Sequence, residues 1–98
     1  MTGNRRKPWS TKRGETLGDD LDLLIGDLCV QWGFCNRLCG DDLLRSGGAI
    51  DAEAFAVAVL RAEAMEPEIE TKWRRAIGRA FVERYGQSQV SESSYETA

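Results

Sequence analysis

Apolar residues recur every three or four positions between Leu21 and Cys39, the most strongly patterned stretch of the chain. At about 100° per residue, eight of them fall within an arc of roughly 140°: Leu21, Leu24, Ile25, Leu28, Trp32, Cys35, Leu38 and Cys39. This pattern predicts one long helix over residues 17–39, with Gly40 as its C-terminal cap. Further apolar and small residues lie on its other sides, so we expect neighbours on several sides and a central place in the fold.

Two more helices are predicted, over residues 51–66 and 68–86, with an extra short helical turn near 41–45. Asp51 is a favoured N-cap, and Pro67 suits the first turn of the third helix. The predicted fold is therefore all-α: a small three-helix bundle over residues 16–86, between disordered tails at 1–15 and 87–98. No strand is predicted. The expected core consists of Leu24, Leu28, Trp32, Phe55, Val59, Trp73, Ile77 and Phe81.

Charge is unevenly distributed along the 98 residues, although the net charge is only −3. Residues 1–14 carry five bases and no acid, residues 15–70 carry 13 acids and three bases, and residues 71–98 carry five bases and three acids. We expect no signal peptide, because no apolar run follows the basic residues at the N-terminus, and no membrane span, because polar and charged residues interrupt the most apolar stretch. With an odd number of cysteines, three, we expect free thiols and a cytoplasmic protein.

The segment from Gly48 to Phe55 resembles the latter half of an EF-hand, a helix–loop–helix calcium-binding unit. The resemblance places Gly48 at the turn and Ile50 in a small sheet-like contact. The loop lacks the oxygen ligands that calcium needs, since the corresponding positions are Leu43, Arg45, Gly47 and Ala54. We therefore expect no calcium binding.

Other chemistry is poorly represented. Cys29, Cys35 and Cys39 form no CxxC pair, the chain has no histidine, and buried packing explains the cysteines better than a metal site. Asp19, Asp20 and Asp22 suit the positive end of the first helix. Without histidine, an activated nucleophile also lacks its commonest base. The sequence thus predicts no metal, no cofactor and no enzymatic activity.

Surplus apolar surface favours a small adaptor or regulatory protein that binds another protein or a second copy of itself. The predicted partner-binding residues are Leu23, Gly26, Val30, Gly33, Phe34, Val57 and Leu60. The alternative is a nucleic-acid-binding regulator that uses the basic N-terminal arm and the last helix. Its predicted contacts are Arg5, Arg6, Lys7, Trp9, Arg75 and Arg79. We expect no membrane association.

Overall fold

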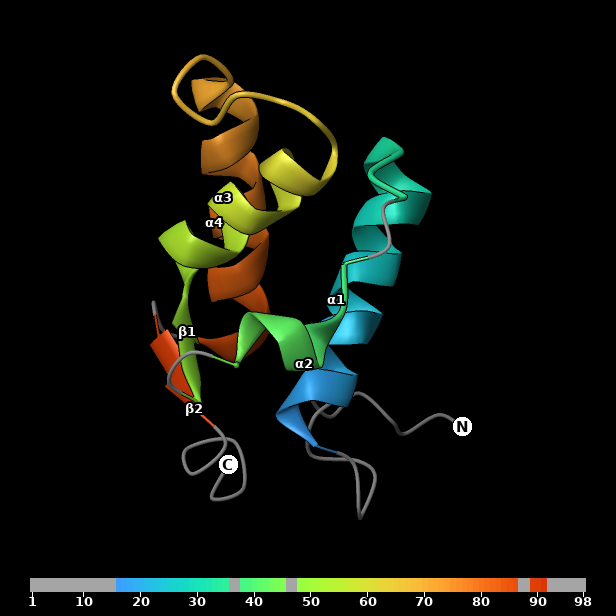
Figure 1. Cartoon of the computed structure of the whole chain (residues 1–98), viewed down its shortest axis with the longest axis vertical. Helices are drawn as coiled ribbons and strands as arrows, with labels where there is room; N and C mark the ends of the chain where they lie inside the picture. Colours follow the sequence, from blue (N-terminus) through green and yellow to red (C-terminus); the bar gives the residue numbers. More distant parts are fainter. Residues whose placement is uncertain (1–15, 36–37, 46–47, 87–88, 92–98) are drawn as a thin grey trace.

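The computed structural model describes residues 16–35, 38–45, 48–86 and 89–91. These residues are mostly helical. The elements, in chain order, are α1 (Leu17–Trp32), α2 (Gly40–Leu43), β1 (Ala49–Asp51), α3 (Ala52–Ala62), α4 (Thr71–Tyr85) and β2 (Gln89–Ser91). In Figure 1, α3 lies in front of α4 on the left of the view, α1 stands on the right, and α2 lies beside the lower part of α1. The predicted helical character is confirmed.

Helix α1 begins where its first residues predict but ends seven residues before the expected end at Cys39. At its start, the Thr16 hydroxyl accepts a hydrogen bond from Asp19 N (3.1 Å), and the Asp19 carboxylate accepts one from Thr16 N (3.4 Å). This capping box satisfies two free backbone donors. At its end, Gly33 adopts a left-handed conformation (φ 82°), so Gly33 rather than Gly40 is the C-cap.

Glycine lets α2 approach the first turn of α1 closely. A β-carbon at Gly40 would lie 2.9 Å from Leu21 Cβ and closer still to the carbonyl group of Gly18. Gly40 N also donates a hydrogen bond to Asp22 Oδ1 (2.6 Å). The predicted turn near 41–45 therefore exists as α2, and it is fixed against α1 by backbone proximity as well as by apolar packing.

Two short strands, which were not predicted, form an antiparallel sheet. Ile50 in β1 is opposite Val90 in β2, and both side chains are buried. The positions implied for Gly48 and Ile50 by the EF-hand resemblance are thus confirmed, because Gly48 has a positive φ of 72° and Ile50 lies in the sheet. Residues 89–91 belong to the segment expected to be a tail, yet they form β2.

Helix α3 begins at the predicted cap, with the Asp51 carboxylate accepting a hydrogen bond from Ala54 N (2.7 Å). Helix α4 begins at Thr71 instead of 68, because residues 67–69 form a turn. Ile69 therefore lies outside the helix and is exposed. Gly86 ends α4 in a left-handed conformation (φ 71°).

The helices pack chiefly as two pairs, α1 with α2 and α3 with α4. Phe55 and Phe81 join α3 to α4, with ring centroids 5.4 Å apart. Six of the eight predicted core residues are buried, and Trp32 and Trp73 are partly buried against them. This pairing and the sheet distinguish the arrangement from a simple three-helix bundle around α1. Within the described residues, no helix is long and apolar enough to cross a membrane.

Candidate functional site

The outer side of α1 carries large apolar side chains in solvent. Leu23 is 50% exposed and Val30 is 86% exposed. Gly26 lies between them and is exposed, with no atom within 4 Å of the place where a β-carbon would be. Because these three residues are three and four positions apart, they share one side of the helix. We call this surface the α1 face. Gly33, the exposed C-cap, follows it.

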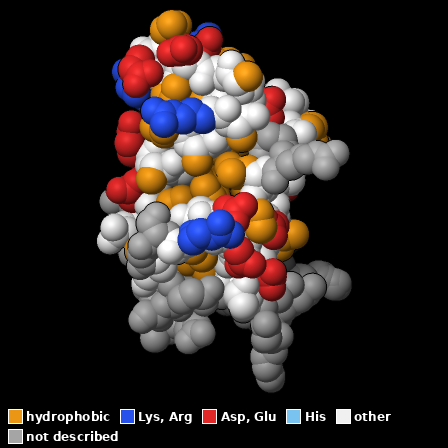
Figure 2. All heavy atoms as spheres, in the orientation of Figure 1, with side chains coloured by type: hydrophobic (Ala, Val, Ile, Leu, Met, Phe, Trp, Pro, Cys, Tyr) orange, Lys and Arg blue, Asp and Glu red, His pale blue; other side chains and the backbone are white. Residues whose placement is uncertain are grey.

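Three other predicted partner contacts do not belong to this surface. Phe34 and Leu60 are buried in the core, and Val57 is half-buried. The prediction for Phe34 was wrong because α1 ends at Trp32, so the chain turns at Gly33 and directs Phe34 inward. Figure 2 shows other hydrophobic side chains gathered between α3 and α2 on the face in view.

The polar surroundings of the α1 face are acidic. Asp19, Asp22 and Asp27 are exposed on α1, and the helix contains no lysine or arginine. The Asp27 side chain is 59% exposed, and one of its oxygens lies 3.6 Å from Arg84 Nη1. We call these three aspartates the acidic rim. An apolar strip inside an acidic rim is suited to an apolar ligand that carries positive charge at its edges.

Asp20 has a different role from the helix-end electrostatics predicted for it. Its side chain is fully buried and binds two groups of α4. Arg84 donates from Nε to Oδ2 (2.8 Å) and from Nη2 to Oδ1 (2.9 Å), and the Tyr85 hydroxyl donates to Oδ2 (2.7 Å). A carboxylate held by a planar guanidinium at two points is strongly oriented. The cluster therefore fixes the first turn of α1 against the last turn of α4.

The same contacts shift the pKa values of the α4 partners. Burial raises the pKa of Tyr85 far above its usual value of 10, and the hydrogen bond to Asp20 raises it further. Burial alone would lower the pKa of Arg84, but the hydrogen bond and negative charge of Asp20 outweigh it, so this pKa is raised. Arg84 therefore stays charged and Tyr85 stays neutral near neutral pH.

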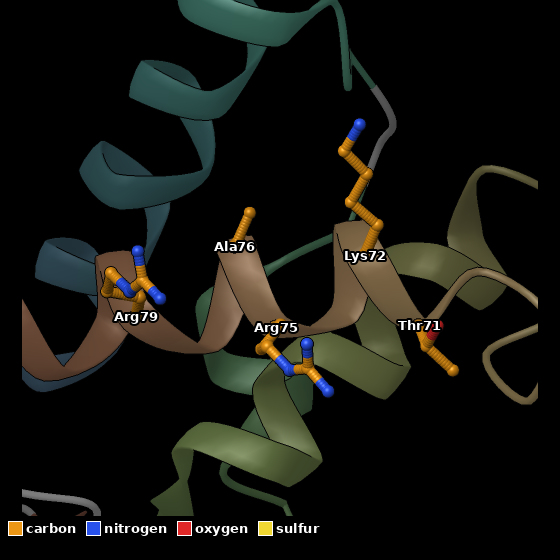
Figure 3. A pocket seen from close by; sticks show the side chains of 5 residues that line it. All are labelled: Thr71, Lys72, Arg75, Ala76 and Arg79. Carbon is orange, nitrogen blue, oxygen red and sulfur yellow. The ribbon is translucent and has the colours of Figure 1, made fainter.

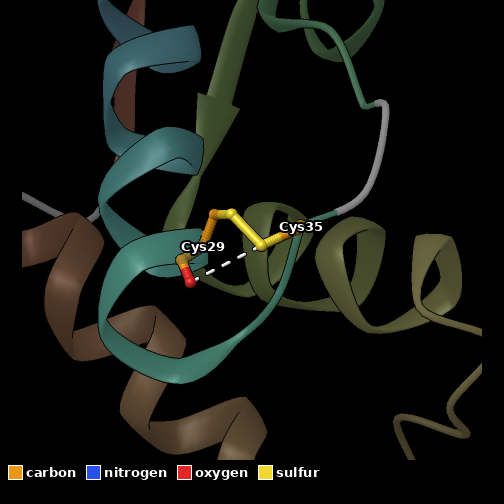
Figure 4. The surroundings of a disulfide bond; sticks show 2 residues. All are labelled: Cys29 and Cys35. Atoms are coloured by element: carbon orange, nitrogen blue, oxygen red, sulfur yellow. Dashed lines mark hydrogen bonds between the residues drawn. A yellow bond between two sulfur atoms is a disulfide. The ribbon is translucent and has the colours of Figure 1, made fainter.

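The cysteines are not all free thiols as predicted. Cys29, in the last turns of α1, forms a disulfide with Cys35, and their Cα atoms are 4.4 Å apart (Figure 4). The Cys35 sulfur also lies 3.6 Å from the Cys29 carbonyl oxygen. The expected separation on a continuous helix does not apply, because α1 ends between the two residues and the chain turns back. Cys39 is a free thiol and is half-buried.

The disulfide closes a ring of seven residues that contains Trp32 and Phe34. Both aromatic rings pack on Trp73 of α4, with centroids 5.4 and 5.0 Å from it. Trp32 and Phe34 contact each other edge to face at 6.3 Å. The C-terminal end of α1 is thus attached to α4 through aromatic packing, as its N-terminal end is through Asp20.

Two of the residues predicted to contact nucleic acid lie in one hollow. Arg75 and Arg79 line a cavity of about 300 Å³ on α4, together with Thr71, Lys72 and Ala76 (Figure 3). Arg5, Arg6, Lys7 and Trp9 lie outside the described residues. The structure therefore brings together the α4 members of this predicted set.

Metal ligands do not converge in the described part of the chain, where no three Cys, Asp or Glu side chains are grouped to hold an ion. In the EF-hand-like segment, Leu43, Arg45 and Ala54 offer no side-chain oxygen. Comparisons with protein-family models, curated proteins and solved structures found no match to this chain. The α1 face and the cavity lined by Arg75 and Arg79 are two candidate binding surfaces of the described residues.

Proposed function

We propose that this protein is a small protein-binding module, and that its α1 face binds an amphipathic, basic helix of a partner protein. The observation that carries the proposal is the exposure of Leu23 and Val30 on either side of an exposed glycine. Large apolar side chains aligned on one helix side are the usual receptor for the apolar side of a second helix.

Gly26 supports a helical partner in particular. A glycine inside a helix costs about 1 kcal/mol relative to alanine. No neighbouring group in the described structure requires a glycine at this position, because a β-carbon at Gly26 would point into open space. A glycine at such a position allows another backbone to approach closely. A second helix lying across Gly26 would contact Leu23 on one side and Val30 on the other.

The acidic rim supports a basic partner over a second copy of this chain. Two α1 faces packed together would bring Asp22 and Asp27 of one copy near the same residues of the other, and like charges at an interface are unfavourable. Lysine or arginine beside the apolar residues of a partner helix would instead face Asp19, Asp22 and Asp27. Nucleic-acid binding has less support, since these exposed carboxylates repel phosphates.

A fluorescent designed peptide tests the proposal directly. The peptide carries leucines at helical spacing on one side and lysines on the other, and binding is measured by fluorescence anisotropy. We expect saturable binding that weakens with salt. Val30→Gln should weaken it about tenfold, since burying one such side chain contributes about 1.5 kcal/mol or more. The matched control is Ile69→Gln, which removes another exposed apolar side chain, one that lies outside α1.

A second peptide of the same composition with scrambled leucine positions controls for simple charge attraction. Equal binding of both peptides, or equal weakening by Ile69→Gln and Val30→Gln, would contradict the proposal. Sedimentation equilibrium tests the competing occupant. If this chain forms a dimer and Val30→Gln dissociates it, the α1 face binds a second copy of the chain and not a basic helix.

A further inference from the structure

The cavity on α4 combines three positive charges with a hydroxyl group. Lys72, Arg75 and Arg79 line it, Thr71 adds its hydroxyl, and Ala76 leaves space between the long side chains. In Figure 3, Lys72 and Ala76 project from one side of α4, and Arg75 and Thr71 lie on the other. We call this feature the basic hollow. Its volume of about 300 Å³ is sufficient for a small anion.

The basic hollow lies on the side of α4 that the other helices leave uncovered. Trp73 and Arg84 of α4 contact α1, while Phe81 packs on α3 and Gly78 lies beside Ala52. Thr71, Lys72, Arg75 and Arg79, which lie away from these contacts, are all exposed. A ligand can therefore reach them without any rearrangement of the helices.

The other two arginines of α4 already have carboxylate partners. Arg74 lies 3.7 Å from Glu53, and Arg84 binds Asp20. By contrast, no carboxylate of the described residues forms an ion pair with Lys72, Arg75 or Arg79. These three cations lie within two turns of each other, where like charges repel. A bound anion would remove that repulsion.

The donors suit phosphate. An arginine guanidinium binds two phosphate oxygens at once in its plane, whereas a lysine ammonium acts as a point charge. The positive stretch from Lys72 to Arg79 spans about 10 Å of helix axis. Two arginines four residues apart can therefore contact neighbouring phosphate groups of one ligand.

Acidic residues limit the length of that ligand. Glu68 and Glu70 precede the basic hollow, and Glu83 follows Arg79 by one turn on the same side of α4. A long polyanion along the helix would pass these carboxylates, whereas a compact one would not. We propose that the basic hollow binds a compact phosphorylated group of about diphosphate size, as free diphosphate or as part of a nucleotide.

Calorimetric titration with inorganic pyrophosphate at low salt tests this site. We expect saturable binding, and we expect the double variant Arg75→Gln, Arg79→Gln to weaken it about tenfold or more. The matched control is Arg45→Gln with Arg61→Gln, which removes the same charge from exposed positions outside α4. This control should bind pyrophosphate within about twofold of the parent chain. Circular dichroism verifies that both variants keep the helical fold.

Two further ligands identify the source of the phosphate. Tighter binding of a nucleoside diphosphate than of pyrophosphate would support a nucleotide, and equal binding would support free diphosphate. Three results would overturn the proposal: no saturable binding of pyrophosphate, an equal loss in the control variant, or single-stranded DNA that binds more tightly as its length increases. The last would assign the surface to a nucleic-acid backbone.

Discussion

Asp20 and Arg84 lie 64 residues apart in the chain, yet both carboxylate oxygens of Asp20 accept hydrogen bonds from Arg84, at 2.8 and 2.9 Å. The Asp20 side chain is fully buried and that of Arg84 is 10% exposed. An ion pair with so little water around it depends on both partners, because either charge alone would be buried without compensation. The pair joins α1 to α4, whose backbones have few other close contacts.

Asp20→Asn should lower the free energy of unfolding by about 3 kcal/mol, because it removes the buried charge that binds Arg84 at two points and leaves only the exposed Asp27, 3.6 Å away, as its carboxylate partner among the described residues. Urea unfolding followed by circular dichroism measures the change. Glu66→Gln, at an exposed position, is the control and should stay within about 0.5 kcal/mol. Asp20→Asn combined with Arg84→Gln should cost less than the sum of the single losses, since both remove the same pair. Additive losses would mean that the two residues do not interact in solution.

Tyr85→Phe should reduce stability by about 1 kcal/mol near neutral pH, because it removes a buried hydrogen bond to Asp20 and keeps the ring against Phe81. The pKa of Tyr85 is raised in the folded state. Above about pH 10 the unfolded chain therefore loses this proton while the folded chain keeps it, and stability falls by up to about 1.4 kcal/mol per pH unit. The contribution of Tyr85 is thus fully present below pH 10 and lost above it.

The difference in the free energy of unfolding between the parent chain and Tyr85→Phe separates the effect of Tyr85 from that of other residues that lose a proton at high pH. The difference should shrink as the pH rises above 10, because only the parent chain loses stability through Tyr85. Urea unfolding at several pH values measures it. A difference that stays constant up to pH 11 would show that Tyr85 has an ordinary pKa.

Reduction of the Cys29–Cys35 disulfide should lower the free energy of unfolding by about 2 kcal/mol, the value expected for a ring of this length. Thermal unfolding with and without a phosphine reductant measures the change. Cys39→Ser should show the same response, since Cys39 is outside the bond. Cys29→Ser with Cys35→Ser should show none. A reductant effect that survives in this double variant would place its origin elsewhere.

Two glycines should respond in opposite ways to alanine. Gly40→Ala should destabilise the fold by about 1–3 kcal/mol, because its β-carbon would collide with the backbone of Gly18. Gly26→Ala should stabilise it by about 1 kcal/mol, because α1 gains helix propensity in open space. Urea unfolding measures both changes. If the α1 face binds a helix, Gly26→Ala should also weaken the binding of the designed peptide. An unchanged affinity would mean that Gly26 is not part of the contact.

Local patterns predicted much of this structure. The spacing of Leu24, Leu28, Phe55 and Phe81 identified core positions, and the exposure of Leu23 and Val30 follows from their place on the opposite side of α1. Asp51 as an N-cap could be predicted because capping depends on residues a few positions apart.

The features that were missed depend on distant partners or on one backbone angle. Val90 pairs with Ile50, 40 residues earlier, so neither three-residue strand has a local pattern that predicts it. The left-handed conformation of Gly33 ends α1, which buries Phe34 and lets Cys29 reach Cys35. A glycine at position 33, directly after the apolar residue Trp32, could have suggested that the helix ends there. Asp20 lies close to the apolar arc of α1, which could have indicated burial, but nothing local identifies Arg84 as its partner.

The packing of Trp32 on Trp73 has a practical consequence for spectroscopy. Two indole rings 5.4 Å apart, one at the end of α1 and one on α4, respond to any displacement between these helices through their ultraviolet fluorescence. Trp9 is the one other tryptophan in the sequence, and Trp9→Phe leaves this pair as the only source of indole emission. Val30 precedes Trp32 by two residues and projects from the opposite side of α1, so the optical reporter lies across this helix from the surface at which we expect a partner to bind.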